Sequence, residues 1–96
     1  MDEAIRFDWD KANTEHIALH AVRPEEAEQA LENDPADLNY EVVEAEDRWI
    51  SIGHTDRLRV LKLVWALGDD AVRVVTALDA SKNEARAYLL AKGIAS

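Results

Sequence analysis

The chain has no cysteine, and its 96 residues include only three glycines and two prolines. Without cysteine there is no disulfide framework, no thiolate nucleophile and no cysteine-ligated zinc. No apolar run approaches the length of a membrane span, and the acidic N-terminus lacks the basic and apolar regions of a signal peptide. The hydrophobic fraction of 48% and the charged fraction of 32% are those of a folded soluble protein. We therefore expect one cytoplasmic domain over residues 1–96, with no contact to a membrane.

Basic residues are also scarce. Eleven Lys and Arg face twenty Asp and Glu, and the resulting net charge of −9 argues against indiscriminate nucleic-acid binding. The charge is uneven, because residues 1–48 hold four basic and fifteen acidic residues (net −11) and residues 49–96 hold seven and five (net +2). The second half can therefore supply a locally positive face on an acidic protein. The alternative is that the acidic helices only keep the domain soluble.

The first third of the chain predicts a short strand and two helices. Residues 4–9 alternate as a strand does, and Asp10 can cap a helix that runs to about His20. Pro24 suits the first turn of a second helix, and residues 33–35 end that helix because the residue before proline avoids the helical region. Each predicted helix has one face whose residues recur at helical spacing. The face of the first contains Asn13, His16, Ile17 and His20, and the apolar face of the second contains Ala27, Ala30 and Leu31.

After residue 36 the hydrophobic period changes from helical to alternating, with Leu38, Tyr40 and Val42 on one side. Further strands are expected at 49–52, 58–67 and 72–77, with turns at 44–47, 53–56 and 68–70. Residues 81–92 predict a last helix, in which Ser81 and Glu84 have capping-box spacing, Ala85, Tyr88 and Leu89 face inward, and Gly93 ends it. The expected fold is α+β, an antiparallel sheet with helices packed on it, in the order β-α-α-β-β-β-β-α.

The opening of the chain resembles that of the BrnT toxin family, small ribonucleases with a RelE-like fold. Trp9-Asp10 leads into His16-Ile17-Ala18-Leu19-His20-Ala21-Val22, and Pro24-Glu25-Glu26 follows. The resemblance continues through Asp47-Arg48-Trp49 and ends in Thr76-Ala77-Leu78-Asp79 and Lys82-x-Glu84-x-Arg86-x-Tyr88. Leu78 stands where the family has an arginine. Ala80 often corresponds to a methionine, Ala21 to a glycine, and Leu19 to a basic residue.

The resemblance implies RNA cleavage without a metal or cofactor. A neighbouring 2′-hydroxyl attacks the phosphodiester, so a site needs a base, an acid and cations that neutralise the phosphorane. The residues expected to be catalytic are His20, Arg59, Glu84 and Tyr88, and those expected to bind RNA are Arg57, Arg73, Lys82 and Arg86. Loss of the arginine at Leu78 removes a charge-stabilising group, which is commonly worth about 10²–10³ in rate.

Several of these residues have a structural alternative. His16 and His20, at i, i+4 spacing, either bind a metal, pack the helix on the sheet, or, for His20, line the site. Glu84 is also the capping partner of Ser81, and Tyr88 lies on the apolar stripe of the last helix. We further expect one positive face built from Arg57, Arg59, Arg73, Lys82 and Arg86.

Two functions are consistent with the sequence. The first is the toxin of a type II toxin–antitoxin pair, an endoribonuclease inhibited by a ribbon-helix-helix antitoxin, acting as a homodimer or in a toxin–antitoxin complex. The second is a catalytically degenerate RelE-like domain that binds protein only. The retained pattern of residues 82–88 favours the first, whereas Leu78 and the acidic charge favour the second.

Overall fold

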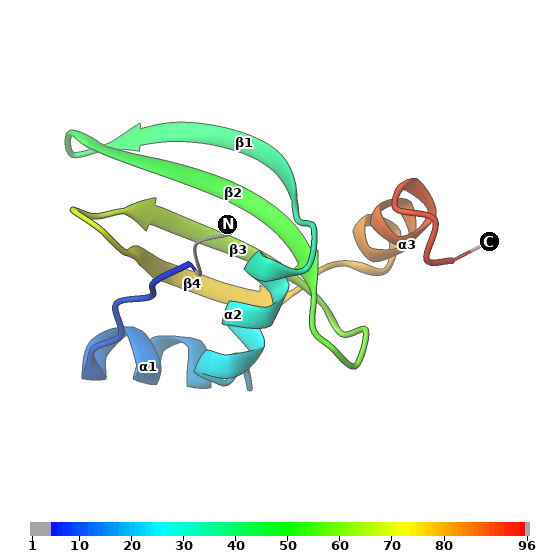
Figure 1. Ribbon diagram of the computed structural model, residues 1–96, viewed down its shortest axis with the longest axis horizontal. Coiled ribbons are helices and arrows are strands. Elements are labelled where there is room, and N and C mark those ends of the chain that lie inside the picture. The colour runs from blue at the N-terminus through cyan, green and yellow to red at the C-terminus, as the bar shows by residue number, and fades with distance from the viewer. Residues whose placement is uncertain (1–4, 96) are drawn as a thin grey trace.

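A four-stranded antiparallel sheet, with strand order β1-β2-β3-β4, forms the centre of the molecule (Figure 1). The computed structural model describes residues 5–95. Helix α1 packs on β4 and α2 packs on β2 and β3, so both helices cover the same face of the sheet. The elements are α1 (Lys11–Ala18), α2 (Pro24–Glu32), β1 (Ala36–Val43), β2 (Glu46–His54), β3 (Val60–Leu67), β4 (Val72–Asp79) and α3 (Lys82–Ala91).

The prediction of an N-terminal strand over residues 4–9 is wrong for residues 5–9, because only Phe7 among them pairs with the sheet. Ala4 lies outside the described residues. Phe7 forms a single parallel bridge with Val72 at the outer edge of β4. Two backbone hydrogen bonds hold it, from Asp8 N–H to the Val72 carbonyl (2.9 Å) and from Val72 N–H to the Arg6 carbonyl (2.8 Å). The segment then leaves the edge so that Trp9 can donate from Nε1 to Glu28 of α2 (2.7 Å). The chain thus has four strands in residues 5–95.

Helix α1 begins as predicted and ends two residues early. The Asp10 carboxylate accepts a hydrogen bond from the Asn13 backbone N–H (2.8 Å), which confirms the cap. The helix ends at Ala18, because the chain turns and Ala21 adopts a positive φ of 56°. The expected stripe is wrong for both histidines: Ile17 is fully buried, but His16 and His20 are exposed.

The predicted boundaries of α2 and α3 are largely confirmed. Pro24 opens α2, whose buried residues are the three predicted ones, Ala27, Ala30 and Leu31. At the start of α3 the Ser81 hydroxyl accepts from Glu84 N–H (3.1 Å), and the Glu84 carboxylate accepts from Ser81 N–H (3.0 Å). This reciprocal pair is the predicted capping box.

Gly53 and His54 were expected to end a strand, and that expectation is wrong. Both lie inside β2, and Gly53 is buried beneath α2. A Cβ atom at Gly53 would lie 2.0 Å from the carbonyl oxygen of Ala30. The glycine is therefore required by the close approach of two backbones and does not mark a turn.

The core lies mainly between the sheet and the first two helices. Ile17 and Val22 pack there with Leu61, Leu63 and Val74 of the sheet. A second, smaller cluster joins α3 to the end of the opposite face and contains Ile52, Val60 and Tyr88. Strand alternation explains the division, because neighbouring residues of β3 point to opposite faces.

Candidate functional site: the open face of the sheet

The sheet face opposite α1 and α2, here called the open face, is covered by α3 at one end only. Residues that pair directly across antiparallel strands lie on the same face, so the register identifies its members. The half-buried floor runs from Ile50 through Val64 to Thr76, and the next row contains Lys62 and Leu78. The open face is therefore an apolar strip framed by charged side chains.

An ion pair connects this strip to α3. Lys62 Nζ lies 3.0 Å from Glu84 Oε2, and both side chains are about one third exposed. The backbone hydrogen bond from Ser81 and the ammonium of Lys62 lower the pKa of Glu84. At neutral pH the carboxylate is therefore ionised, and it is available as a proton acceptor wherever a ligand displaces Lys62.

A second charged group lies at the other end of the open face. Glu46 Oε1 accepts from Arg48 Nε (2.9 Å), and Glu46 Oε2 accepts from Arg73. These two hydrogen bonds, from Arg48 first, lower the pKa of Glu46. One carboxylate thus holds two guanidinium groups side by side, and the group keeps a net positive charge.

Tyr88 of α3 lies at the covered end, and only 4% of its surface is exposed. Its hydroxyl lies 2.9 Å from His54 Nδ1, and it can donate to the carbonyl oxygen of Asn33 (3.2 Å) or Asp34 (3.1 Å). Burial, with a smaller effect of the Asp34 carboxylate, raises the pKa of Tyr88. The phenol is therefore neutral at physiological pH, and it ties α3 to the corner between α2 and β1.

Arg59 lies on the opposite side of the sheet, against the first two helices. Its Nε donates to Asp79 (2.7 Å), and its Nη1 donates to the Ala21 carbonyl (2.8 Å) and to Glu26 (3.2 Å). Its Nη2 donates to the His20 carbonyl (3.3 Å). This guanidinium joins four segments, and through its hydrogen bond it lowers the pKa of Asp79. Its donors are committed to the fold, so Arg59 acts as a structural clamp.

The structure does not bring the four predicted catalytic residues together. Glu84 and Tyr88 lie at the open face, whereas Arg59 and the backbone of His20 meet on the helix-covered face. His20 is exposed beside the clamp. Two clusters on opposite faces therefore replace the single constellation that the sequence predicted.

The predicted cations are also dispersed. Arg73 pairs with Ala66, seven residues along β3 from Arg59, which corresponds to about 23 Å. Arg57 is exposed and lines a pocket of about 350 Å³ beside the clamp. Lys82 and Arg86 are exposed on α3. Each is two residues from Glu84, or about 200° around the helix, so both lie on the opposite side of α3 from Glu84. The expected single positive face of all five residues is not formed.

Sequence reasoning missed the partners that define the open face. Lys62 was not among the residues predicted for the site, and His54 was assigned to the turn at 53–56. The alternation of Ile50, Ile52 and His54 along β2 is the signal that could have placed His54 on this face. The sequence could not show that Glu46 binds both Arg48 and Arg73, because Arg73 is far from Glu46 in the sequence.

Residues 5–95 contain no group of three or more His, Asp or Glu side chains arranged to hold a metal ion. No helix in the same part of the chain is long and apolar enough to cross a membrane. What the open face does offer is three strand-borne cations, Arg48, Lys62 and Arg73, around two carboxylates.

Comparison with known proteins identifies the family of the chain. No curated protein matches the chain. Residues 9–84 match the model of a family described as the ribonuclease toxin, BrnT, of type II toxin-antitoxin systems. The match covers the first two helices, the whole sheet and the first turn of α3. The chain therefore belongs to the BrnT family of ribonuclease toxins of type II toxin–antitoxin systems.

Proposed function

We propose that this protein is a cytoplasmic, metal-independent endoribonuclease whose RNA site is the open face. The family supplies the activity, and the observation that supports this location is the cluster of cations around a half-buried apolar strip. The protein as a whole carries a net charge of −9, so RNA needs a local positive surface to approach. The four-stranded antiparallel sheet with helices on one face also fits a RelE-like fold.

The chemistry proposed for the open face uses residues already in contact. Lys62 would bind the phosphate and leave Glu84, whose carboxylate then accepts the proton of the attacking 2′-hydroxyl. The neutral phenol of Tyr88, hydrogen-bonded to His54, would protonate the leaving oxygen once a small opening of α3 exposes it. Arg73 would hold a flanking phosphate at the far end of the open face, and Lys82 and Arg86 would meet phosphates that pass over the exposed side of α3.

Leu78 occupies the position of the family arginine, and its place in the register explains how that substitution affects the site. It pairs directly with Lys62, so its side chain lies beside the Lys62–Glu84 pair. An arginine there would add a guanidinium next to the proposed phosphate position. The present chain lacks that charge, and we infer a slower enzyme than one that has it.

The experiment measures cleavage of a structured RNA by the purified protein, with and without EDTA. We expect activity in EDTA, a loss of about 10²-fold for Lys62→Ala and an increase for Leu78→Arg. Lys11→Ala is the matched control, because Lys11 is an exposed lysine on α1 whose ion pair, with Glu15, is itself exposed. Equal activity of Lys62→Ala and Lys11→Ala would exclude the open face as the site.

A second candidate, a protein-binding domain without catalysis, is favoured by Leu78 and by the fact that Arg48, Lys62 and Arg73 are already paired with carboxylates. In that case neither the parent protein nor Leu78→Arg cleaves RNA. Binding of a ribbon-helix-helix antitoxin, which we propose as the partner under the first function, would then be the remaining activity. Co-purification of the two chains distinguishes this outcome from a misfolded enzyme.

A further inference from the structure

Strand β1 forms an edge of the sheet and is unusually exposed. It pairs with β2 on one side, and no strand of residues 5–95 pairs with its other side. The six residues between its two ends are all exposed. One side of its backbone therefore faces solvent with N–H and C=O groups that no strand pairs, although the Tyr40 N–H donates to the Asn39 side chain (2.8 Å).

Large apolar side chains accompany this free edge. Leu38, Tyr40 and Val42 are 49%, 51% and 59% exposed. The Tyr40 ring lies 5.5 Å from the Trp49 ring, which stacks on Trp65 at 4.9 Å, so an aromatic row leads inward from the edge. Charges such as Asp37 and Glu41 normally protect an edge strand from pairing with the edge of another sheet, but exposed apolar residues of this size mark an interaction surface.

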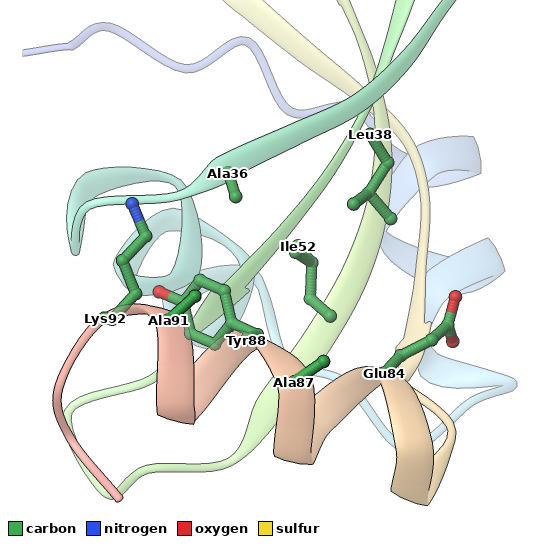
Figure 2. A pocket seen from close by; sticks show the side chains of 8 residues that line it. All are labelled: Ala36, Leu38, Ile52, Glu84, Ala87, Tyr88, Ala91 and Lys92. Carbon is green, nitrogen blue, oxygen red and sulfur yellow. The ribbon is translucent and has the colours of Figure 1, made fainter.

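A groove lies beside the first residues of β1, between that strand and α3 (Figure 2). Its volume is about 320 Å³, and Leu38, Ile52, Ala87 and Ala91 supply apolar walls. Figure 2 shows the side chains from α3 facing those of β1 and β2 across the space. The alanines leave it open, and its size suits one large apolar side chain of a ligand.

The charge at this edge selects the kind of partner. Residues 36–47, which include β1 and the turn after it, contain five carboxylates and no Lys or Arg: Asp37, Glu41, Glu44, Glu46 and Asp47. Glu46 is paired with Arg48 and Arg73, so the other four carboxylates set the charge of the outer edge of β1. A polyanion such as RNA is repelled at that outer edge. A second copy would bring the same carboxylates to face one another, since a twofold contact repeats one surface on both partners. A basic polypeptide is attracted.

We propose that the outer edge of β1 binds an extended, basic polypeptide segment that adds to the sheet as a fifth strand. Main-chain hydrogen bonds to β1 supply the general affinity. An apolar side chain of the segment fills the groove of Figure 2 beside Leu38, and lysines or arginines further along the segment meet Glu41 and Glu44. That this segment belongs to an antitoxin rests on the proposed function, whereas the surface itself does not.

The test is selection of random 12-residue peptides displayed on phage against the immobilised full chain. Enriched peptides should be basic, with an alternating pattern and one large apolar residue. A synthetic copy of one such peptide should slow amide hydrogen exchange in Ala36–Val43. Glu41→Lys with Glu44→Lys should weaken it at least tenfold, and Ala87→Trp, which fills the groove, should do the same.

The matched control is Glu15→Lys with Glu25→Lys, which changes the net charge equally at exposed positions on α1 and at the start of α2. If this control weakens binding as much, the attraction is only that of an acidic protein and the proposal fails. It also fails if no basic peptide is enriched, if a 12-nucleotide RNA protects the same amides, or if β1 proves to be a dimer contact. RNA cleavage is measured in the same preparations: a chain that binds the peptide but does not cleave refutes the ribonuclease and leaves the docking surface intact.

Discussion

Replacement of Gly53 by alanine should separate α2 from the sheet. The added Cβ atom would lie 2.0 Å from the Ala30 carbonyl oxygen and 2.8 Å from its carbon. An ordinary contact of that kind needs about 3.4 Å, so the helix must move by roughly 1.4 Å relative to β2. Overpacking of a tight core commonly costs about 1–3 kcal/mol, and the loss of freedom of the unfolded chain returns only about 0.4–1 kcal/mol.

The clash is with backbone that no rotamer change can relieve, so we expect a cost near the top of that range and, after the return, a net destabilisation of about 2–2.5 kcal/mol. For a domain of this size it lowers Tm by about 8–20 °C. Urea unfolding followed by circular dichroism measures the free energy of unfolding directly. Gly68→Ala is the matched control, since its Cβ would meet no atom closer than 3.4 Å.

Two results would refute the reasoning. Equal stability of Gly53→Ala and Gly68→Ala would show that α2 does not approach β2 as closely as the structure has it. Rescue of Gly53→Ala by Ala30→Gly would show that the clash involves the Ala30 side chain, whereas the contact described here is with its carbonyl group.

Three other changes should affect stability. Tyr88→Phe should cost about 1–2 kcal/mol in thermal melts, because it leaves a buried carbonyl without its donor, and an unchanged Tm would contradict the hydrogen bonds described. Ala45→Gly should add about 1 kcal/mol, since residue 45 has a φ of 64° in a two-residue hairpin turn; a loss of stability would contradict this. Arg59→Met should cost about 2 kcal/mol at pH 7. The pKa values of Glu26 and Asp79 are lowered in the fold, so these carboxylates stabilise it above about pH 4.5 and lose this effect as the pH falls through their folded pKa values. The difference in free energy of unfolding between the parent and Arg59→Met should therefore shrink in acid.

Local signals in the sequence predicted the secondary structure well. The Asp10 cap, Pro24 at the start of α2 and the Ser81–Glu84 box each depend on residues no more than three positions apart, and the structure confirms all three. The apolar run 58–67 predicted a strand, and β3 occupies most of it. Local chemistry determines helix ends and strand periods, so the sequence alone was sufficient there.

Features that depend on tertiary contact were not predictable in the same way. Glycine is typical of turns, so the sequence predicted a turn at Gly53. Only the position of α2 shows that Gly53 is needed for the close approach of the helix to β2. Arg59 was predicted to be a catalytic residue that stabilises the charge of the phosphate. Nothing nearby in the sequence shows that Glu26 and Asp79 surround it in the fold. The site was therefore predicted in its residue types but not in its grouping, since grouping is set by which face of the sheet each strand residue points to.

Helix α3 is fastened to the rest of the protein mainly by side chains: the Tyr88 hydroxyl, the Lys62–Glu84 pair and Lys92, which lies 3.2 Å from Asp34. An element held in this way opens at a lower free energy than a sheet held by its ladder of backbone bonds. Glu84 and the wall of the groove in Figure 2 then move together whenever α3 detaches. A ligand seated in the groove would add its binding energy to the closed state. Because Glu84 itself lines the groove, occupancy of the groove and the geometry of this carboxylate are thermodynamically linked.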